Sequence, residues 1–424
     1  MPGPSACSKL TLQSNAAARV HLPPGVPDLQ LGVAAGMAVD LDRLIADPHA
    51  HVPHGAVTGA RRSLQSAVMA PKFVRPTVRD MDGYTPGEQP APGARVIKLN
   101  TNENPYPPSP DVMKAIRDIE PESLRRYPQP AADAFREAAA KVLGVAAEQI
   151  LAGNGSDDVL TIATRTFVPP GGTLASPEPS YSLYPVLAKL EEATFVGVKW
   201  LDGYELPVEG LLATKPDAIY LANPNAPTGT FVAPAKVAEL AKAFDGLVLV
   251  DEAYVDFADD NCLSLVKDHA NVVVSRTLSK AYSLAGLRFG FAVARPAVIE
   301  QMAKVKDSYN CDAIAIAAAT AAILDQDHAR QQWDMVRGER QRLSAELTQM
   351  GWDVLPSQAN FLLARPPSGR GKDVYLGLKE QGILVRHFDK PGLADKVRIT
   401  IGTPQEMNAL LGGIKALSAA EKAA

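Results

Sequence analysis

Short apolar runs alternate along most of the chain with stretches in which apolar residues recur every three or four positions. From Val96 onward the runs are typical of buried strands, and the stretches between them have the period of amphipathic helices. The predicted strands are Val96–Leu99, Ile150–Ala152, Ala218–Ala222, Leu247–Val250, Val272–Ser275 and Phe289–Ala294. The predicted helices include Ser156–Phe167, Ala235–Phe244 and Pro296–Lys306. This alternation predicts a mostly parallel sheet covered on both faces.

The pattern changes in the last hundred residues. A long amphipathic pattern at Ala329–Met350 predicts a helix that leads into a second, smaller region. The strands expected there are Phe361–Leu363, Ile383–Val385 and Val397–Ile401. We therefore expect an α/β protein with a large domain over residues 106–325 and a smaller α+β domain over residues 326–424.

The first 68 residues differ from the rest. They contain seven prolines, four of the seven histidines and no glutamate, with weak periodicity apart from a short amphipathic piece around Val39–Ala46. This composition is poor for packing a core, so residues 1–68 are expected to be a disordered or non-native extension. They lack the pattern of a secretory signal, although their low acidity leaves a transit peptide open. Residues 69–105, which begin at Met69, are expected to form an arm or lid.

Composition narrows the classes of function. The 424 residues are 46% hydrophobic and carry a net charge of −4, which gives no general attraction to nucleic acid or anionic membranes. The three cysteines, Cys7, Cys262 and Cys311, are widely spaced, so free thiols in the cytoplasm are expected. No apolar stretch is long enough to predict a transmembrane span. The histidine cluster His49-Ala-His51-Val-Pro-His54 could bind metal, but a solvated loop is the stronger interpretation, and no metal site is expected.

Lys280 is the first candidate for chemistry. It stands in Arg276-Thr-Leu-Ser-Lys-Ala-Tyr-Ser-Leu-Ala-Gly-Leu-Arg288, directly after a predicted buried strand. A lysine in such a loop can be desolvated, which lowers its pKa and frees the amine for Schiff-base chemistry. Ser279 and Arg288 are candidate phosphate donors in the same loop. A surface lysine is the usual alternative, but the neighbouring motifs favour the functional interpretation.

Asp251 closes the apolar run Leu247–Val250. A carboxylate there is unfavourable unless it has a partner, and a pyridinium nitrogen is such a partner. Capping of the next helix is the alternative.

Three further segments follow predicted strands. Gly153-Asn-Gly-Ser156 opens a helix, where glycine backbone and helix N–H groups could hold a phosphate. Asn223-Pro-Asn-Ala-Pro-Thr-Gly229 is a turn of unusual composition, and an ordinary turn is its alternative. Tyr181, in Pro177-Glu-Pro-Ser-Tyr-Ser-Leu-Tyr184, could stack on a cofactor ring or could pack in the core.

Taken together, these segments resemble the fold-type I aminotransferases, which depend on pyridoxal 5′-phosphate (PLP). The resemblance covers about residues 75–415 and implies a seven-stranded sheet in the large domain. Its histidinol-phosphate aminotransferase branch is indicated by Leu99-Asn-Thr-Asn-Glu-Asn-Pro105, Arg126-Tyr-Pro128, Arg276-Thr-Leu-Ser-Lys280, Val385-Arg-His-Phe-Asp-Lys-Pro391 and Val397-Arg-Ile-Thr-Ile-Gly402.

The resemblance implies a role for each matching residue. Lys280 is expected to carry PLP as a Schiff base and to move a proton, Asp251 to pair with the pyridine nitrogen and Tyr254 to contact the 3′-oxygen of the ring. The remaining cofactor contacts are expected from Gly155, Ser156, Tyr181, Ser279, Arg288 and, across a homodimer interface, Tyr127. The expected substrate contacts are Arg398 with the α-carboxylate, Arg386 with the distal phosphate or carboxylate, Tyr84 in the lid, and Asn360.

One position departs from the pattern of the family. Related enzymes often carry Asn-Asn-Pro-Thr-Gly, in which the second asparagine contacts the 3′-oxygen, and here that position is Ala226. Either Asn225 supplies the contact or Tyr254 makes it alone.

The implied reaction is amino transfer between L-histidinol phosphate and 2-oxoglutarate in histidine biosynthesis. A related PLP enzyme, an aromatic-amino-acid aminotransferase or a threonine-phosphate decarboxylase, is the nearest alternative. An alternative of another class is a non-catalytic PLP-binding domain of a transcription regulator. Such regulators carry a basic helix-turn-helix domain before the fold, and residues 1–68 have neither feature.

Overall fold

The computed structural model describes residues 9–11, 16–20, 29–33, 38–40, 71–85, 87–91 and 93–423, which divide into one unit ending at Asp80 and another beginning at Met81. In the first unit, β1 (Lys9–Thr11) pairs antiparallel with β4 (Ala38–Asp40), and β2 (Ala16–Val20) pairs antiparallel with β3 (Leu29–Val33). The short helix α3 (Pro76–Arg79) belongs to the same unit.

The weak periodicity of this segment did not predict the four strands. The histidine cluster, Cys7, Met69 and most of the amphipathic piece lie outside the described residues. The expectation that residues 1–68 are an extension to the working protein stays a prediction.

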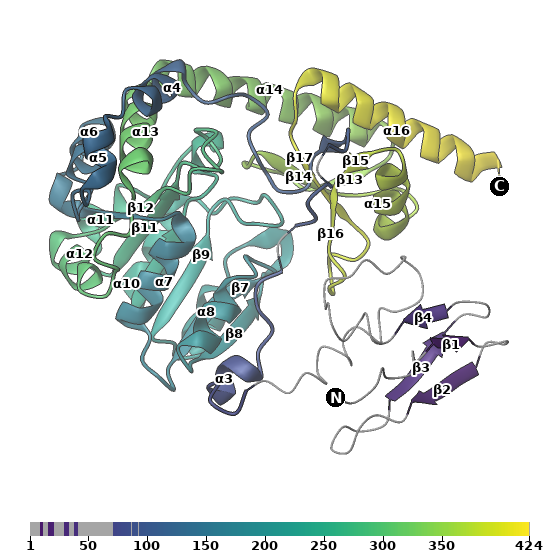
Figure 1. Ribbon diagram of the computed structural model, residues 1–424, viewed down its shortest axis with the longest axis horizontal. Coiled ribbons are helices and arrows are strands. Elements are labelled where there is room, and N and C mark those ends of the chain that lie inside the picture. Colours follow the sequence, from purple (N-terminus) through teal and green to yellow (C-terminus); the bar gives the residue numbers. More distant parts are fainter. Residues whose placement is uncertain are drawn as a thin grey trace, which may run out of the picture. The chain divides into compact units, whose positions relative to one another are not determined.

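A seven-stranded sheet forms the centre of the second unit (Figure 1). Its strands in spatial order are β6 (Ile150–Gly153), β12 (Gly290–Val293), β11 (Val272–Thr277), β10 (Leu247–Asp251), β9 (Ala218–Ala222), β7 (Thr173–Glu178) and β8 (Thr194–Lys199). Only β12 runs antiparallel to its neighbours, so the expected mostly parallel sheet is confirmed.

Both faces of this sheet are buried. Along β10, Val248 and Val250 join one apolar cluster, whereas Leu247 and Leu249 join another on the opposite face. Because strand side chains alternate between faces, a strand buried on both sides shows the continuous apolar run seen in the sequence.

Helices supply the covering layers. The first cluster includes side chains of α6 (Asp133–Leu143), α10 (Pro234–Ala243) and α13 (Ala313–Leu324), and the second includes those of α7 (Ser156–Phe167), α8 (Tyr184–Leu190) and α12 (Pro296–Ala303). The other helices of this part are α4 (Pro110–Arg117), α5 (Pro121–Arg125), α9 (Val208–Ala213), α11 (Leu265–Asp268) and the 3-10 turns Ala147–Gln149, Asp202–Tyr204 and Val255–Phe257.

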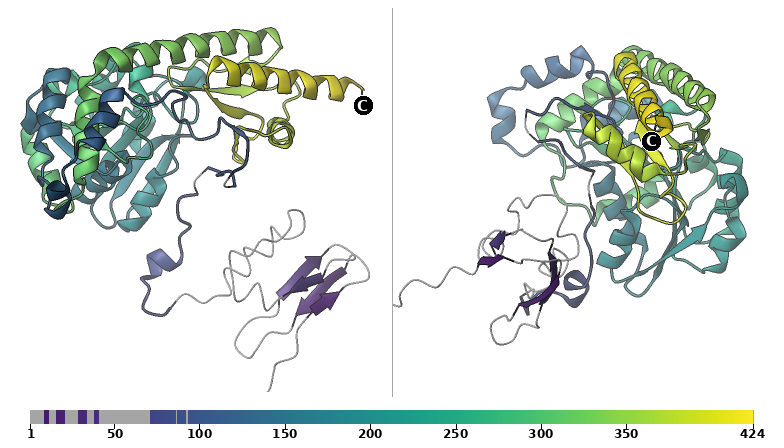
Figure 2. Two further views of the ribbon diagram at one scale, coloured as in Figure 1. Left: turned by 45° about the horizontal axis from the view of Figure 1, so that its top comes forward. Right: turned by 90° about the vertical axis from the view of Figure 1, so that its right-hand side faces the viewer.

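The long helix α14 (Gln326–Gln349) runs from the large sheet region to a smaller one, as Figure 2 shows. There a four-stranded sheet has the order β13 (Asp353–Val354), β14 (Phe361–Arg365), β17 (Val397–Thr400), β16 (Arg386–His387). Its helices are α15 (Gly371–Glu380) and α16 (Pro404–Ala423), and β15 (Ile383–Leu384) pairs in parallel with β5 (Ile97–Lys98).

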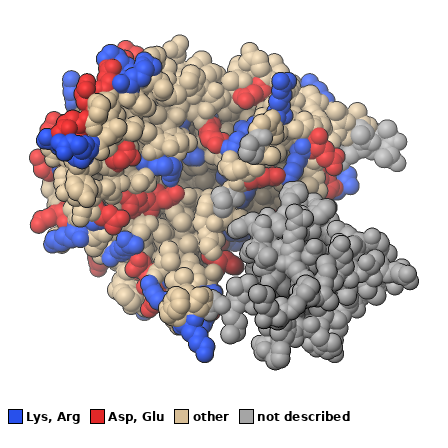
Figure 3. All heavy atoms as spheres, viewed as in Figure 1, with Lys and Arg blue, Asp and Glu red and all other residues tan. Residues whose placement is uncertain are grey.

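The topology brings the candidate residues to one edge of the large sheet. Asp251 ends β10, Lys280 follows β11, and Gly155 follows β6. These strands run in the same direction, so their carboxyl ends share an edge, which is where open α/β sheets bind ligands. Charged side chains of both signs are scattered over the face shown in Figure 3. In the described part of the chain, no helix is both long and apolar enough to cross a membrane.

Candidate active site

Lys280 is half-buried in the loop after β11. Its Nζ donates a hydrogen bond to the carbonyl oxygen of Thr101 at 3.1 Å and lies 5.9 Å from the centre of the Tyr254 ring. Burial, assisted by the nearby guanidinium of Arg398, lowers the pKa of Lys280 to about 8. A substantial fraction of the amine is therefore uncharged near that pH and can act as a nucleophile or base.

Asp251 is buried at the end of β10, with 4% of its surface exposed. Its Oδ2 accepts a hydrogen bond from the Tyr184 hydroxyl at 2.9 Å, whereas Oδ1 accepts no hydrogen bond of good geometry from the described residues. Burial raises the pKa of Asp251 to about 7, although the bond from Tyr184 lowers it. A buried carboxylate oxygen without a donor is unfavourable, so the site is suited to a ligand that brings a protonated nitrogen.

The residues expected to hold a phosphate form a cradle at the start of α7. Arg288 donates through Nη1 to the Ser279 hydroxyl at 3.2 Å, and its Nη2 lies 3.5 Å from Oδ2 of Asp157. Gly155 precedes the helix with a φ of +86°, and a Cβ there would lie 2.7 Å from Nη2 of Arg288. Only glycine allows this approach. The first turn of α7, which begins at Ser156, adds the backbone N–H groups and positive dipole end that favour phosphate.

Two tyrosines lie next to this cradle. The Tyr181 hydroxyl donates to Oδ1 of Asp157 at 3.1 Å, and its ring meets that of Tyr184 edge-on at 5.6 Å. Tyr84, from the arm, lies 6.0 Å from the Tyr181 ring at an interplanar angle of 64°. The arm residue and the expected stacking residue are thus brought together.

Tyr254 is held from the arm side. Its hydroxyl accepts from Nδ2 of Asn102 at 2.9 Å, and the backbone carbonyl of Asn102 accepts from Nδ2 of Asn360 at 3.0 Å. The Tyr254 ring packs edge-on against Phe361 at 5.1 Å. Burial raises the pKa of Tyr254, so its hydroxyl stays protonated at neutral pH and can donate.

The turn after β9 does not present Asn225 to the same place. Both amide hydrogens of Asn225 are used, one on the Pro179 carbonyl at 3.1 Å and one on Oγ1 of Thr228 at 2.8 Å. Its Oδ1 accepts from the Ser180 hydroxyl at 2.9 Å. A contact from Asn225 to a cofactor would require these bonds to rearrange.

The two C-terminal arginines lie opposite each other, because Arg386 on β16 is the register partner of Arg398 on β17. Nη2 of Arg398 donates to the carbonyl oxygen of Asn100 at 2.9 Å, whereas its buried Nε has no hydrogen-bond partner among the residues that the structure describes. Both guanidinium groups lie 5.4 Å from the centre of the Phe388 ring. Burial, together with the charge of Arg386, lowers the pKa of Arg398. The two like charges therefore lie on the same face of the small sheet.

Two of the unpaired polar atoms, Asp251 Oδ1 and Arg398 Nε, belong to residues expected to contact the cofactor and the substrate. Among the described residues, the buried side-chain atoms without a hydrogen bond are Asp251 Oδ1, Ser275 Oγ, Asn360 Oδ1 and Arg398 Nε. With Lys280 and the cradle at Arg288, the Asp251 atom provides an amine, a carboxylate and an anion site at one edge of the sheet. This arrangement fits PLP.

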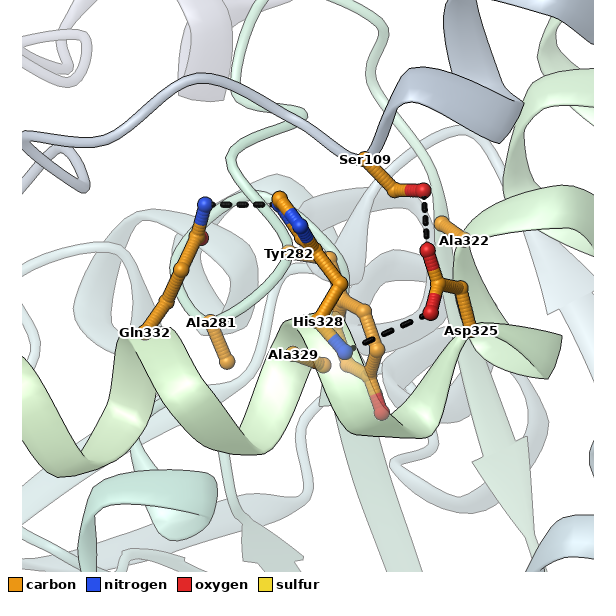
Figure 4. Close-up of a pocket in the computed structure, with 8 residues that line it drawn as sticks. All are labelled: Ser109, Ala281, Tyr282, Ala322, Asp325, His328, Ala329 and Gln332. Atoms are coloured by element: carbon orange, nitrogen blue, oxygen red, sulfur yellow. Dashed lines mark hydrogen bonds between the residues drawn. The ribbon is translucent and has the colours of Figure 1, made fainter.

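A small polar pocket adjoins the lysine loop (Figure 4). It is lined by Ser109, Ala281, Tyr282, Ala322, Asp325, His328, Ala329 and Gln332. The Ser109 hydroxyl donates to Asp325, and Gln332 lies 2.8 Å from His328. The polar side chains that line the pocket hydrogen-bond to one another. We therefore interpret the pocket as a structural support for the loop that carries Lys280.

Tyr127 lies at the surface. It is 80% exposed and stacks on Tyr309 with 4.4 Å between ring centres. Thr101, Asn102 and Tyr184 also belong to this site, and no sequence pattern predicted a role for them. Asn102 lies within the motif Leu99-Asn-Thr-Asn-Glu-Asn-Pro105, but only the folded chain shows that it reaches Tyr254.

Comparisons with known proteins agree with this geometry. A family model described as aminotransferase class I and II matches residues 94–414. The chain is 46% identical over 345 residues to histidinol-phosphate aminotransferase 1 of Nostoc sp., covering 81% of this chain and 98% of that protein. It is also 46% identical to histidinol-phosphate aminotransferase of Rhodopirellula baltica, covering 80% of this chain and 93% of that protein.

The fold is likewise similar to solved structures. The crystal structure of histidinol-phosphate aminotransferase from Sinorhizobium meliloti in complex with pyridoxal-5'-phosphate matches with a TM-score of 0.74 at 26% identity. The match covers 82% of this chain and 99% of that one.

Proposed function

Because this chain belongs to the class I and II aminotransferase family, we propose that it is a PLP-dependent histidinol-phosphate aminotransferase. It transfers an amino group reversibly between L-histidinol phosphate and 2-oxoglutarate, giving imidazole-acetol phosphate and glutamate. The proposal is supported by relatives of that name that are 46% identical over nearly their whole length. The cytoplasmic location, the homodimer and the place in histidine biosynthesis belong to the same proposal.

Three groups of this chain would hold PLP. Lys280 supplies the amine, the unpaired Oδ1 of Asp251 accepts the ring N–H, and the cradle around Arg288 takes the phosphate. When bound, the cofactor supplies an electron sink for the negative charge left when the Cα proton of the substrate is removed.

The residues around the position of the PLP ring have separate tasks. Asp251 keeps the ring nitrogen protonated, because its buried carboxylate is stabilised by a cation beside it. Lys280 takes the Cα proton and returns it, and its pKa of about 8 lies near working pH, where a general base is most effective. Tyr181 covers one side of the ring position, and Tyr84 extends that cover toward the arm and helps to exclude water.

The paired arginines carry the substrate assignment. Side chains directly opposite in antiparallel strands share a face, and like charges there are destabilising. An anionic substrate removes this penalty. Arg398 can grip an α-carboxylate with its unpaired Nε, and Arg386 can meet a distal phosphate or carboxylate, so one site serves both histidinol phosphate and glutamate.

The exposed Tyr127 supports the dimer. A tyrosine that is 80% exposed can reach a neighbouring subunit, where the proposal places it on the cofactor phosphate. Tyr127→Phe should then weaken PLP retention without changing the fold, and dilution that dissociates the dimer should abolish activity. A fully active monomer would exclude the shared site.

A half-reaction assay tests the substrate. The absorbance of the bound cofactor is followed after addition of histidinol phosphate, phenylalanine, tyrosine or threonine phosphate. We expect the fastest reaction with histidinol phosphate. Arg386→Ala should lower kcat/KM for histidinol phosphate and glutamate by about 10- to 100-fold, as loss of a charged hydrogen bond does, and should change that for phenylalanine little.

Arg365→Ala is the matched control, because Arg365 lies in the same small sheet but pairs with Asp395 at its surface. Its preferences should equal those of the wild type. An unchanged preference in Arg386→Ala would contradict the substrate assignment, and release of carbon dioxide from threonine phosphate would indicate a decarboxylase.

A further inference from the structure

Position 226 offers no hydrogen bond to a cofactor. Ala226 is 7% exposed and packs with Ala359 and Phe361 in an apolar cluster that also contacts Tyr254. Since the amide hydrogens of the preceding Asn225 are both used elsewhere, neither side chain of this turn supplies a free donor. Tyr254 is left as the donor next to the turn.

The amide of Asn102 has a defined orientation. Its backbone N–H donates to Oγ1 of Thr400 at 3.0 Å, so the Thr400 hydroxyl must send its own hydrogen elsewhere. That hydrogen meets Oδ1 of Asn102 at 3.1 Å. Because Oδ1 is thereby identified as the acceptor, Nδ2 is the atom that faces the Tyr254 hydroxyl at 2.9 Å, and it donates.

This bond controls the hydrogen of Tyr254. A phenol has one hydrogen, which stays near the plane of the ring, and Nδ2 of Asn102 occupies one of the directions it could take. No other hydrogen bond of this hydroxyl occurs among the described residues. The hydroxyl thus accepts from Asn102 and keeps its own hydrogen for a second partner.

We propose that Asn102 is a positioning residue that directs the Tyr254 hydrogen to the 3′-oxygen of bound PLP, a task that the turn at Ala226 does not share. Asn102 suits this task because it is 1% exposed and held on three sides, by Thr400, Asn360 and Tyr254. The inference rests on the proposed function only for the identity of the cofactor.

The pH titration of the visible absorption band of the holoenzyme measures this effect. A hydrogen bond from Tyr254 stabilises negative charge on the 3′-oxygen. It therefore favours loss of the proton that the Lys280 nitrogen shares with that oxygen, and it lowers the midpoint of the titration. Loss of the bond must raise the midpoint.

Two substitutions separate positioning from packing. Asn102→Gly removes the amide while tolerating the φ of +57° at this position, and it should raise the midpoint by about 0.5 to 1 unit. Asn102→Asp keeps the shape but turns a donor into an acceptor, which draws the Tyr254 hydrogen toward itself. It should raise the midpoint further, whereas a packing role predicts that this isosteric change is the milder one.

A double-mutant cycle completes the test. Tyr254→Phe should raise the midpoint at least as far, and adding Asn102→Gly to it should add nothing. Thr400→Val, which removes the orienting hydroxyl, should give a smaller shift in the same direction. Cofactor content after denaturation verifies that each variant is loaded.

An unchanged midpoint in Asn102→Gly, or an equal shift with and without Tyr254, would overturn the proposal. If the wild-type enzyme binds PLP on Lys280 but does not react with histidinol phosphate, only the substrate assignment is overturned. The proposal on Asn102 is still testable, because the titration requires no substrate.

Discussion

Ionised Asp251 lowers the stability of the cofactor-free protein, although the same carboxylate is proposed to bind the cofactor. Its pKa is raised by burial from 3.8 to about 7, so the folded protein binds a proton that the unfolded chain has lost between these values. The stability that accompanies the neutral carboxyl is fully present below about pH 4 and is lost as the pH rises through about 7. In the cofactor-free protein, ionised Asp251 is therefore destabilising.

Asp251→Asn tests this conflict. Turnover should fall by several orders of magnitude, because the ring nitrogen loses the anion that keeps it protonated. At pH 8 the cofactor-free variant should be more stable than the cofactor-free wild type by up to a few kcal/mol, and the two should converge near pH 4. Urea unfolding at several pH values measures the difference.

The exposed Asp334→Asn is the control and should leave the pH dependence unchanged, since its side chain is 71% accessible. A variant at Asp251 that is less stable than the wild type at every pH, or one with normal turnover, would contradict the role given to this carboxylate.

At the residue scale, the sequence predicted the groups that have strong local signals. Lys280 and Asp251 follow apolar strands, and Gly155 precedes a helix, so each signal lies within a few neighbouring residues. The bond between Asn102 and Tyr254 joins residues 152 positions apart, and the bond from Tyr184 to Asp251 spans 67. Such pairings depend on the packed sheet, and no local pattern contains them.

Among the helices and strands, those that are buried in a regular pattern could be predicted from the sequence. The bounds of β9 and α7 agree with the sequence pattern. The strand β9 is apolar throughout, and α7 begins directly after Gly155 and keeps its amphipathic period to its last turn. The strands β7 and β8 were not predicted. β7 contains Pro177 and polar residues, and β8 is a half-exposed edge strand, so neither has the apolar run of the central strands.

The helix α14 joins the lysine loop to the segment after the arm. Buried Gln332 donates to the carbonyl of Pro107 at 2.6 Å, and its Oε1 accepts from Asn104 at 3.2 Å and from Ser283 at 3.3 Å. The neighbouring Trp333 donates to the carbonyl of Ala281 at 2.9 Å. One turn of the helix therefore ties the loop that follows Lys280, at Ala281 and Ser283, to the segment that carries Asn104 and Pro107.

Gln332→Ala should leave several buried groups without partners and lower the free energy of unfolding by about 1 to 3 kcal/mol. It should also weaken PLP retention, because the lysine loop loses its support. Gln331→Ala, at an exposed position of the same helix, should change stability by less than about 0.5 kcal/mol. Equal effects of the two variants in denaturant unfolding would remove this role from Gln332.

At the scale of the whole molecule, the N-terminal segment lies outside the part of the chain that the family model matches. The matched 345 residues cover 98% of the Nostoc relative but only 81% of this chain, and the family model begins at residue 94. The fold expected for the rest, a large α/β region with a smaller C-terminal one, was predicted from the sequence because alternating strands and helices leave few arrangements.

A variant that begins at Met69 should fold and turn over normally, as measured by circular dichroism and the half-reaction. One that begins at Ala94 also loses Tyr84 and the ion pair between Glu88 and Lys379 at 2.7 Å, so its activity should fall. Loss of folded protein in the longer variant would show that residues 1–68 contribute to the core.

Borohydride reduction tests whether Lys280 carries PLP. The holoenzyme is reduced with borohydride, digested and mapped by mass spectrometry. We expect a stable pyridoxyl adduct on Lys280 and on no other lysine, and no adduct in Lys280→Ala protein loaded with PLP. An adduct on another lysine, or the same labelling in the alanine variant, would contradict it.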